Sequence, residues 1–147
     1  MNASKNFSPE FVEYIPEALQ DGMLYVSMKY GTASHLCACG CGHEVTTPLT
    51  PTDWQLHFDG VGVSLEPSIG NWSLPCRSHY WIWNNQVRWS RDMTDTQIED
   101  GRRRSARAKQ RHYAERRSGD PDAAADAKPH PVGRGQKGLW GQLFAKR

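Results

Sequence analysis

The sequence predicts a mainly β body followed by a separate basic segment. Five of the six tryptophans fall between Trp54 and Trp89, close to all four cysteines of the chain. Short runs in this part alternate apolar and polar residues with period two, which is typical of strands. Charge also divides the chain: residues 1–101 hold 5 Lys/Arg against 12 Asp/Glu, a net of −7, whereas residues 102–147 hold 13 against 4, a net of +9. We therefore expect an acidic body and a basic C-terminal part.

Residues 1–21 are predicted to be a flexible N-terminal arm, because they carry few apolar side chains. One helical turn around Pro9 to Tyr14 is the only order expected there. Gly22 then precedes Met23 to Tyr30, a run in which apolar residues alternate with polar or aromatic ones, and this run predicts a strand. The β domain is expected to cover residues 22–92.

Two hairpins are predicted inside this domain. The first runs from Trp54 to Leu65 and turns at Asp59-Gly60, because Asp-Gly between alternating strands favours a type I′ turn. The second runs from Tyr80 to Trp89 around Asn84-Asn85. One face of the first hairpin is wholly apolar and should cover a core. The residues expected to supply that core are Trp54, Phe58, Val63, Leu65, Trp72, Trp81 and Ile82.

The character of the chain changes from Thr94. Thr94 and Gln97 fit a capping box, in which a hydroxyl and an amide side chain satisfy backbone groups at a helix N-terminus. A basic helix is predicted over residues 93–118, with little apolar surface along it. The Ala, Asp, Pro and Gly content of residues 119–147 predicts a disordered tail.

The composition predicts a cytoplasmic protein. No segment approaches the roughly 20 apolar residues of a membrane span, and residues 1–17 lack the apolar core of a signal peptide. A reducing compartment favours thiolate ligands over disulfides.

The spacing of the cysteines predicts a metal site. Cys37, Cys39 and Cys41 alternate with Ala and Gly, and Cys76 and His79 form a C-x-x-H pair beyond the first hairpin. Zinc is usually held by two such ligand pairs at distant points of a chain. We therefore predict one structural Zn²⁺ ion with Cys39, Cys41, Cys76 and His79 as ligands, and Cys37 as the alternate. The fold class is then a small zinc-stapled antiparallel β domain with a C-terminal basic helix and disordered tail.

Two other interpretations of the cysteines stay open. Buried free thiols are common in protein cores, although three cysteines within five residues are hard to explain in that way. An iron–sulfur cluster would use all four cysteines, and the histidine of the C-x-x-H pair is the reason to favour zinc.

Three motifs carry a resemblance to a known family: His35-Leu-Cys-Ala-Cys-Gly-Cys-Gly, Val63-Ser-Leu-Glu-Pro-Ser-Ile-Gly-Asn-Trp72 and Cys76-Arg-Ser-His-Tyr-Trp-Ile82. Over about residues 20–90 the chain resembles a domain-of-unknown-function family of small bacterial proteins, often encoded beside ThiF-type adenylating enzymes and ubiquitin-like proteins. The resemblance implies an accessory module of a ubiquitin-like conjugation or processing system. Its expected partners are a ubiquitin-like protein or an E1/E2-like enzyme.

The same context makes a serine-type peptidase an alternative. A hydroxyl nucleophile needs a base within hydrogen-bond reach and a group that orients the base. Ser68 and His35 are the catalytic candidates that we carry forward, and the sequence leaves open whether the protein is an enzyme. The other candidates are Ser64, His57 and His79, with Asp53 or Asp59 as orienting groups. Plainer explanations are a turn position for Ser68, an outward position on the hairpin for His57 and metal binding for His79.

The basic segment supports a second alternative, nucleic-acid binding, because clustered cations neutralise phosphates without reading sequence. A solvated extension, or one that folds back on the acidic body, is the plainer interpretation. The residues proposed for contact with nucleic acid are Arg102, Arg103, Arg104, Arg107, Lys109 and Arg111.

Overall fold

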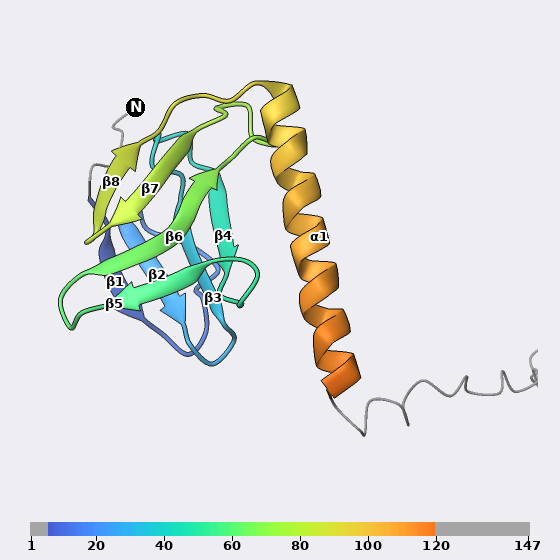
Figure 1. The fold of residues 1–147 in the computed structure, drawn as a ribbon. Coiled ribbons are helices and arrows are strands. Elements are labelled where there is room, and N and C mark those ends of the chain that lie inside the picture. The colour runs from blue at the N-terminus through green and yellow to red at the C-terminus, as the bar shows by residue number, and fades with distance from the viewer. Residues whose placement is uncertain (1–5, 120–147) are drawn as a thin grey trace, which may run out of the picture. The chain divides into compact units, whose positions relative to one another are not determined.

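A computed structural model describes residues 6–119, which form two four-stranded sheets and one helix (Figure 1). The mainly β fold with a C-terminal helix is therefore confirmed. The elements are β1 (Ser8–Phe11), β2 (Met23–Ser27), β3 (Thr32–Leu36), β4 (Glu44–Pro48), β5 (Gln55–Phe58), β6 (Val63–Gly70), β7 (His79–Trp83), β8 (Gln86–Trp89) and α1 (Asp95–Gly119).

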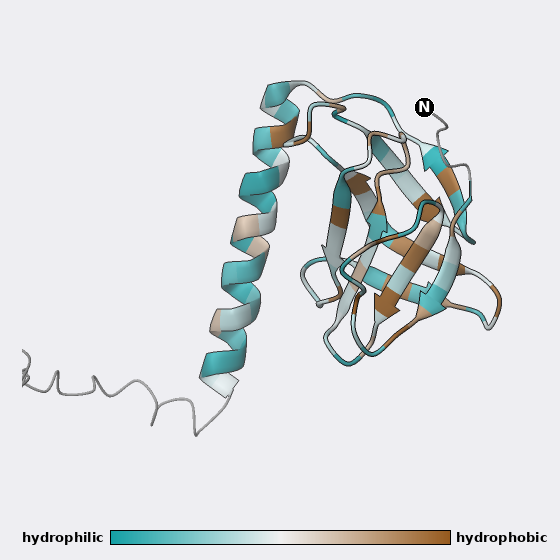
Figure 2. Ribbon diagram, turned by 180° about the vertical axis from the view of Figure 1, so that it is seen from behind, coloured by the Kyte–Doolittle hydropathy of each residue, from teal (hydrophilic) through white to brown (hydrophobic). Residues whose placement is uncertain are grey.

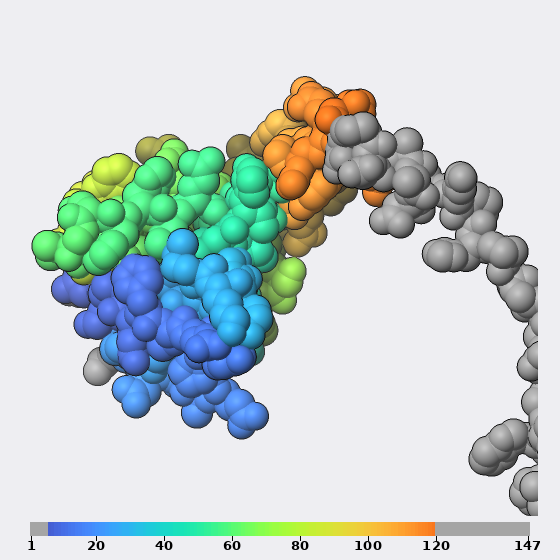
Figure 3. Space-filling model, turned by 90° about the horizontal axis from the view of Figure 1, so that it is seen from below, coloured from blue at the N-terminus to red at the C-terminus, as the bar shows by residue number. Residues whose placement is uncertain are grey.

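Each sheet follows the order of the chain. The first has the order β1-β2-β3-β4, and the second has the order β5-β6-β7-β8. All neighbouring strands are antiparallel except β1 and β2, which are parallel. In the space-filling view the strands of the first sheet, in blue to cyan, lie against those of the second, in green to yellow (Figure 3). The body is thus two sheets packed face to face.

Both sheets contribute side chains to one core, and the hydropathy colouring shows apolar positions alternating along the strands (Figure 2). Leu24, Val26 and Ala33 come from the first sheet, and Leu65 and Ile82 from the second; none is more than 1% exposed. Burying a side chain of this size stabilises a fold by about 1.5–3 kcal/mol. The shared core therefore requires both sheets to form together.

The predicted hairpins are present, and one turn differs from the prediction. Asn84 and Asn85 both have positive φ, as the type I′ turn requires, and join Trp83 to Gln86. The first hairpin pairs Phe58 with Val63, so its loop has four residues rather than the two expected at Asp59-Gly60. The Asp59 carboxylate accepts hydrogen bonds from the backbone N–H groups of Val61 and Gly62, which stabilises the longer loop.

The predicted core is only partly the observed one. Val63, Leu65 and Ile82 are buried, and Trp54 packs against the core. Phe58 is 50% exposed and directly precedes the four-residue loop of the first hairpin. Trp72, in the loop after β6, and Trp81, which lies between the buried Tyr80 and Ile82 of β7, are half-buried. Additional core residues, not predicted, are Leu24, Val26, Ile69 and Tyr80.

The N-terminal segment differs from the flexible arm expected for residues 1–21. Instead of a helical turn around Pro9, residues 8–11 form β1 and pair with β2. The physical reason is Phe7, which is 2% exposed in the core and whose N–H donates to Asn85 O of the other sheet at 2.6 Å. A single buried aromatic ring anchors a segment that otherwise has few apolar residues.

Helix α1 begins with the predicted capping box. The N–H of Gln97 donates to Thr94 Oγ1 at 3.3 Å, and the N–H of Thr94 donates to Gln97 Oε1 at 3.0 Å. Ile98 is the buried residue of the helix. The chain divides into two units, residues 1–109 and 110–147, and the second unit begins within α1. The tail expected at residues 119–147 lies, beyond Gly119, outside the described residues. In the described part of the chain no helix combines the length and apolar character needed to cross a membrane.

His35 lies in the core instead of at a solvent-exposed site. It is 0% exposed on β3, its Nε2 is 2.8 Å from Tyr80 Oη, and its ring packs edge-on against Phe7. Its Nδ1 is enclosed without a hydrogen-bond partner among residues 6–119. Burial lowers the pKa of His35 to about 3. The imidazole is therefore neutral in the folded protein at any ordinary pH.

We expect this neutral histidine to make the fold acid-sensitive. The pKa of His35 is lower in the folded than in the unfolded protein. Its contribution to the free energy of unfolding is therefore complete above pH 6.5 and is lost as pH falls toward 3. Between pH 7.5 and pH 5 this amounts to about 2 kcal/mol. His35→Gln keeps an acceptor for Tyr80 but does not titrate. Urea unfolding at both pH values should show that the variant loses about 2 kcal/mol less on acidification; equal losses in the two proteins would contradict the expectation.

Candidate active site

An irregularity in β6 positions the half-buried Ser68. β6 pairs with β7 at Leu65 and Ile82 and again at Ile69 and Tyr80. Three residues of β6 stand between these pairs but only one residue of β7, so β6 bulges. Bulges of this kind re-aim side chains and are frequent beside active sites. The side chain of Ser68, within the bulge, is thereby directed toward the neighbouring strand.

His79, the first residue of β7, meets Ser68 through one ring nitrogen. Its Nε2 is 2.9 Å from Ser68 Oγ, and its Nδ1 is 2.7 Å from the backbone carbonyl oxygen of Arg91. A carbonyl can only accept, so Nδ1 carries the proton and Nε2 is left as an acceptor. The Ser68 hydroxyl then donates to Nε2. This is the tautomer in which a histidine can remove a proton from a serine.

Trp72 fixes the ring of His79 from the side. The two rings meet edge to face with centroids 4.9 Å apart. The indole reaches this position only because residue 70 is glycine: a Cβ at Gly70 would lie 2.3 Å from Trp72 Nε1. The main chain adds a restraint, since the N–H of Ser90 donates to His79 O at 2.8 Å. His79 is therefore held by its ring, its backbone and its Nδ1 partner.

Arg77 holds the segment that supplies the orienting carbonyl. Its guanidinium donates to Met93 O at 3.2 Å, lies 3.3 Å from the Asp95 carboxylate and covers the ring of Trp72 at 5.6 Å. These contacts bridge the loop before β7 and the chain that leads from Arg91 into α1. The carbonyl of Arg91 is thus fixed by tertiary contacts beyond the sheet.

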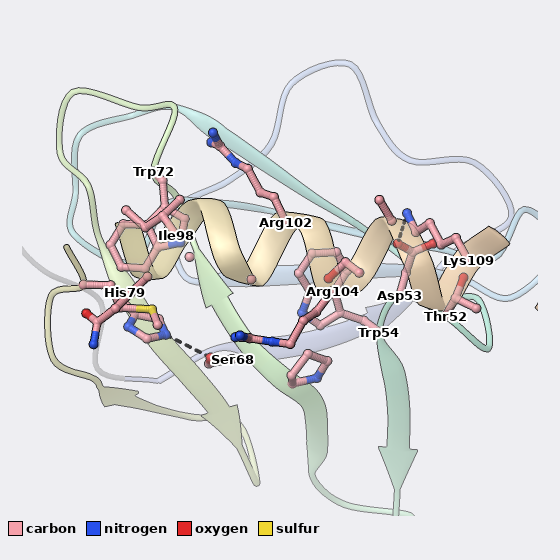
Figure 4. Close-up of a pocket in the computed structure, with 17 residues that line it drawn as sticks. Thr52, Asp53, Trp54, Ser68, Trp72, His79, Ile98, Arg102, Arg104 and Lys109 are labelled. Carbon is pink, nitrogen blue, oxygen red and sulfur yellow. Dashed lines mark hydrogen bonds and ion pairs between the residues drawn. The ribbon is translucent and has the colours of Figure 1, made fainter. Parts of the chain in front are cut away.

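Ser68 and His79 open into a groove of about 740 Å³ within the first unit (Figure 4). The body side of the groove includes Trp54, Trp72 and the Ser68–His79 pair. The helix side includes Ile98, Arg104 and Lys109. A groove of this size admits an extended segment of polypeptide or a similar acyl group.

The four cysteines form a separate cluster that could hold a metal ion. The Sγ atoms of Cys37, Cys39, Cys41 and Cys76 all lie within 4.8 Å of one another. Cys76 Sγ is 3.9 Å from Cys37 Sγ and 3.8 Å from Cys41 Sγ. Four sulfurs around a zinc ion at 2.3 Å would be about 3.8 Å apart. The geometry therefore fits one tetrahedral ion.

Polar neighbours surround the sulfurs. Ser78 Oγ is 3.0 Å from Cys37 Sγ, and His43 Nδ1 is 3.2 Å from Cys41 Sγ. Burial opposes ionisation of Cys76, but hydrogen bonds from the side chain and backbone of Ser78 outweigh it and lower its pKa to about 7. Burial, with hydrogen bonds to neighbouring thiols, raises the pKa of Cys39 to about 12. A bound cation would remove this cost by stabilising the thiolates.

The structure groups the predicted ligands differently from the sequence. Cys37, the alternate, lies with the other three cysteines, whereas both ring nitrogens of His79 contact Ser68 and Arg91 instead of the cluster. The tighter cluster arises because Cys37, which directly follows β3, is buried in the core. We therefore treat His79 as part of the candidate active site.

The catalytic candidates are also grouped differently. Ser68 meets His79 and not His35, which is enclosed by the core. Ser64 is buried and accepts a hydrogen bond from the N–H of Asn84, and His57 is exposed, 3.7 Å from Glu66.

The proposed orienting carboxylates have other partners as well. Asp53 pairs with Lys109 at 2.6 Å, and Asp59 caps its own hairpin loop. The group that orients His79 is the backbone carbonyl of Arg91, which was not predicted because no side-chain motif marks a backbone carbonyl. The Gly70-x-Trp72 spacing was the available hint that the loop packs closely on itself.

The basic residues do not form one uniform surface. Arg102, Arg104 and Lys109 line the groove, whereas Arg103 pairs with Glu99 at 3.4 Å along the helix. Arg107 is exposed, and Arg111 is exposed in the second unit.

A profile of the family described as "Bacterial ubiquitination-like system serine protease (BubE)" matches residues 11–90 of the chain. The match includes Ser68, His79 and all four cysteines and ends before α1. No match was found among curated proteins or among solved structures.

Elemental analysis of purified protein tests the cysteine cluster. We expect one metal ion per chain, lost in Cys37→Ser because a closed site needs all four thiolates. His79→Ala should retain the ion, since its ring nitrogens have other partners. Retention by Cys37→Ser together with loss in His79→Ala would restore the ligand set predicted from the sequence.

Proposed function

The chain belongs to the BubE family of bacterial ubiquitination-like system serine proteases, and on that premise we propose that it hydrolyses an acyl bond of a ubiquitin-like protein, with Ser68 as nucleophile and His79 as general base. The observation that carries the assignment is the 2.9 Å contact between Ser68 Oγ and His79 Nε2, with Nδ1 committed to a carbonyl. This assignment replaces the candidate pair of Ser68 with His35.

The first step follows from this arrangement. As Ser68 Oγ attacks the carbonyl carbon of the substrate, His79 Nε2 takes its proton, and an acyl-enzyme forms when the leaving group departs with that proton. A water molecule deprotonated by the same nitrogen then releases the acyl group. Proton transfer by a positioned histidine contributes about 10²–10⁴-fold to such reactions.

Arg91 takes the role that a carboxylate has in many serine hydrolases. Its carbonyl oxygen accepts the Nδ1 proton, holds the tautomer and faces the imidazolium that forms during the reaction. A neutral carbonyl stabilises that cation less than a carboxylate would. We expect the fixed position of His79, between Trp72 and its backbone contacts, to matter correspondingly more.

We further propose that the four cysteines bind one structural Zn²⁺. A site closed by four thiolates leaves no position for a water or substrate, so the ion would stabilise the fold and take no part in hydrolysis. Cys76 lies three residues before His79, so the cluster would fix the start of β7. Iron bound by four thiolates is the alternative that elemental analysis separates.

The proposal keeps the ubiquitin-like partner and adds catalysis to the accessory role first expected. It does not extend to nucleic acid, because the family description names a ubiquitination-like system, and two of the six candidate residues, Arg103 and Lys109, are already paired with Glu99 and Asp53.

A fluorophosphonate probe, which phosphonylates activated serines with loss of fluoride, tests the pair directly. We expect one label per chain on Ser68 by intact-protein mass spectrometry, and none on Ser68→Ala. His79→Ala should slow labelling by about 10²–10⁴-fold, because Ser68 loses its base. His57→Ala is the matched control, since His57 is an exposed histidine of the adjacent strand. Unchanged labelling in His79→Ala would refute the assignment.

Gly70→Ala tests the placement of His79. The new Cβ would displace the indole of Trp72, so labelling should slow by roughly tenfold to a hundredfold while the protein stays folded. Gly101→Ala is the control, because its nearest atom would be 3.9 Å away. Equal rates in the two variants would show that Trp72 does not position the base.

A further inference from the structure

Helix α1 forms a fixed wall of the groove. Ile98, Gly101, Ser105 and Lys109 follow the three- and four-residue spacing of one helix face, and all line the groove. Ile98 is 7% exposed and anchors the first turns. Near the other end of this face, Lys109 Nζ lies 2.6 Å from Asp53 Oδ1. The wall is thus attached at both ends to the β body.

The charge along this wall is not balanced. Asp53 is the carboxylate among the described lining residues, and Lys109 already pairs with it. Arg102 and Arg104 are the other charged residues that line the groove, and no carboxylate of the described lining is left to pair with them. Among residues 6–119 the side chain of Arg104 has no hydrogen bond or ion pair. An unpaired cation in a partly enclosed groove attracts anions more strongly than one in open solvent.

The two arginines differ in direction. Figure 4 shows the Arg104 side chain extending along the groove with its guanidinium toward Ser68, whereas Arg102 points away from the Ser68–His79 pair. A guanidinium offers parallel N–H donors that match a carboxylate. A carboxylate held by Arg104 would therefore lie in the same groove as Ser68.

We propose that Arg104 is a specificity-determining residue that binds an acidic side chain of the substrate within a few residues of the scissile bond. The inference rests on the proposed function and names a substrate feature for the same site. The family profile ends at residue 90, so α1 lies outside the matched region that holds Ser68 and His79. The helix would thus add selectivity to a reaction centre built by the β body.

Hydrolysis of matched esters tests the proposal. The probes are the 4-methylumbelliferyl esters of acetyl-Glu-Gly, acetyl-Gln-Gly, acetyl-Glu-Gly-Gly and acetyl-Gln-Gly-Gly, which place a carboxylate or its neutral isostere at two distances from the reacting carbonyl. We expect the wild-type protein to prefer Glu over Gln by roughly tenfold in kcat/KM for at least one length. Arg104→Ala should abolish the preference and retain hydrolysis of the Gln ester. Arg104→Glu should reverse the preference, and Arg103→Ala, on the same helix but paired with Glu99, should keep it.

Equal kcat/KM for Glu and Gln esters in the wild-type protein would overturn the proposal. So would an equal loss on both esters in Arg104→Ala, because Arg104 would then act on the reaction itself. Failure of the proposed function looks different: all esters would be hydrolysed no faster by the wild-type protein than by Ser68→Ala.

A binding measurement keeps the two questions apart. Ser68→Ala is titrated with the amides acetyl-Glu-Gly-Gly-NH₂ and acetyl-Gln-Gly-Gly-NH₂, with the Arg Nε–H resonances followed by NMR. Selective binding of the Glu peptide, lost in Ser68→Ala/Arg104→Ala and weakened by salt, supports the proposal. Equal binding of both peptides, or binding of neither, overturns it whatever the hydrolysis shows.

Discussion

The hydrogen-bonded closure between Asn71 and Ser78 is the constraint on which the rest of the site depends. The N–H of Asn71 donates to Ser78 O at 2.8 Å, and its side-chain amide donates to Ser78 Oγ at 2.9 Å. Both residues are buried, so these groups would be costly to leave unpaired. Outside this closure lie Ser68 and His79, one on each strand. Cys76 of the cysteine cluster lies between Asn71 and Ser78 in the chain, and Cys37 Sγ lies 3.0 Å from Ser78 Oγ.

A second polar network below this closure connects the two sheets. Tyr80 Oη lies 3.4 Å from the side-chain amide of Asn71 and from the N–H of Ala38, and 2.8 Å from His35 Nε2. The Asn71 amide and the Ala38 N–H both donate to Tyr80 Oη, so the phenol donates its own proton to Nε2 of the neutral His35. The network is satisfied at Tyr80 Oη, whereas His35 Nδ1, which then carries the ring proton, has no partner among residues 6–119. His35, one of the candidate catalytic residues from the sequence, is thus a buried residue linked to Asn71 through Tyr80.

The arrangement separates stabilisation from chemistry over a very short stretch of chain. Cys76 faces the sulfur cluster and His79 faces Ser68, with Arg77 between them in a positive-φ conformation. That backbone conformation turns the chain so that neighbouring side chains reach different partners. Arg77 itself fixes Trp72 and the segment that carries the Arg91 carbonyl. The metal site proposed for the cysteines and the proposed catalytic pair would therefore respond together to changes in this turn.

The sequence by itself determined the local structure and the clusters of residue types. Strand β2 follows from period-two alternation, the second hairpin from Asn84-Asn85 and the start of α1 from Thr94 and Gln97, because each depends on interactions within a few residues. Tertiary structure alone decided which atoms meet. By residue type, His79 could bind a metal beside thiolates or accept a hydrogen bond from a serine. The bulge in β6 brings Ser68 to it. The group that orients His79 is a backbone carbonyl, which every residue possesses, so no residue type could have marked Arg91. Pairing of distant atoms is set by strand register and loop packing, and those are properties of the whole core.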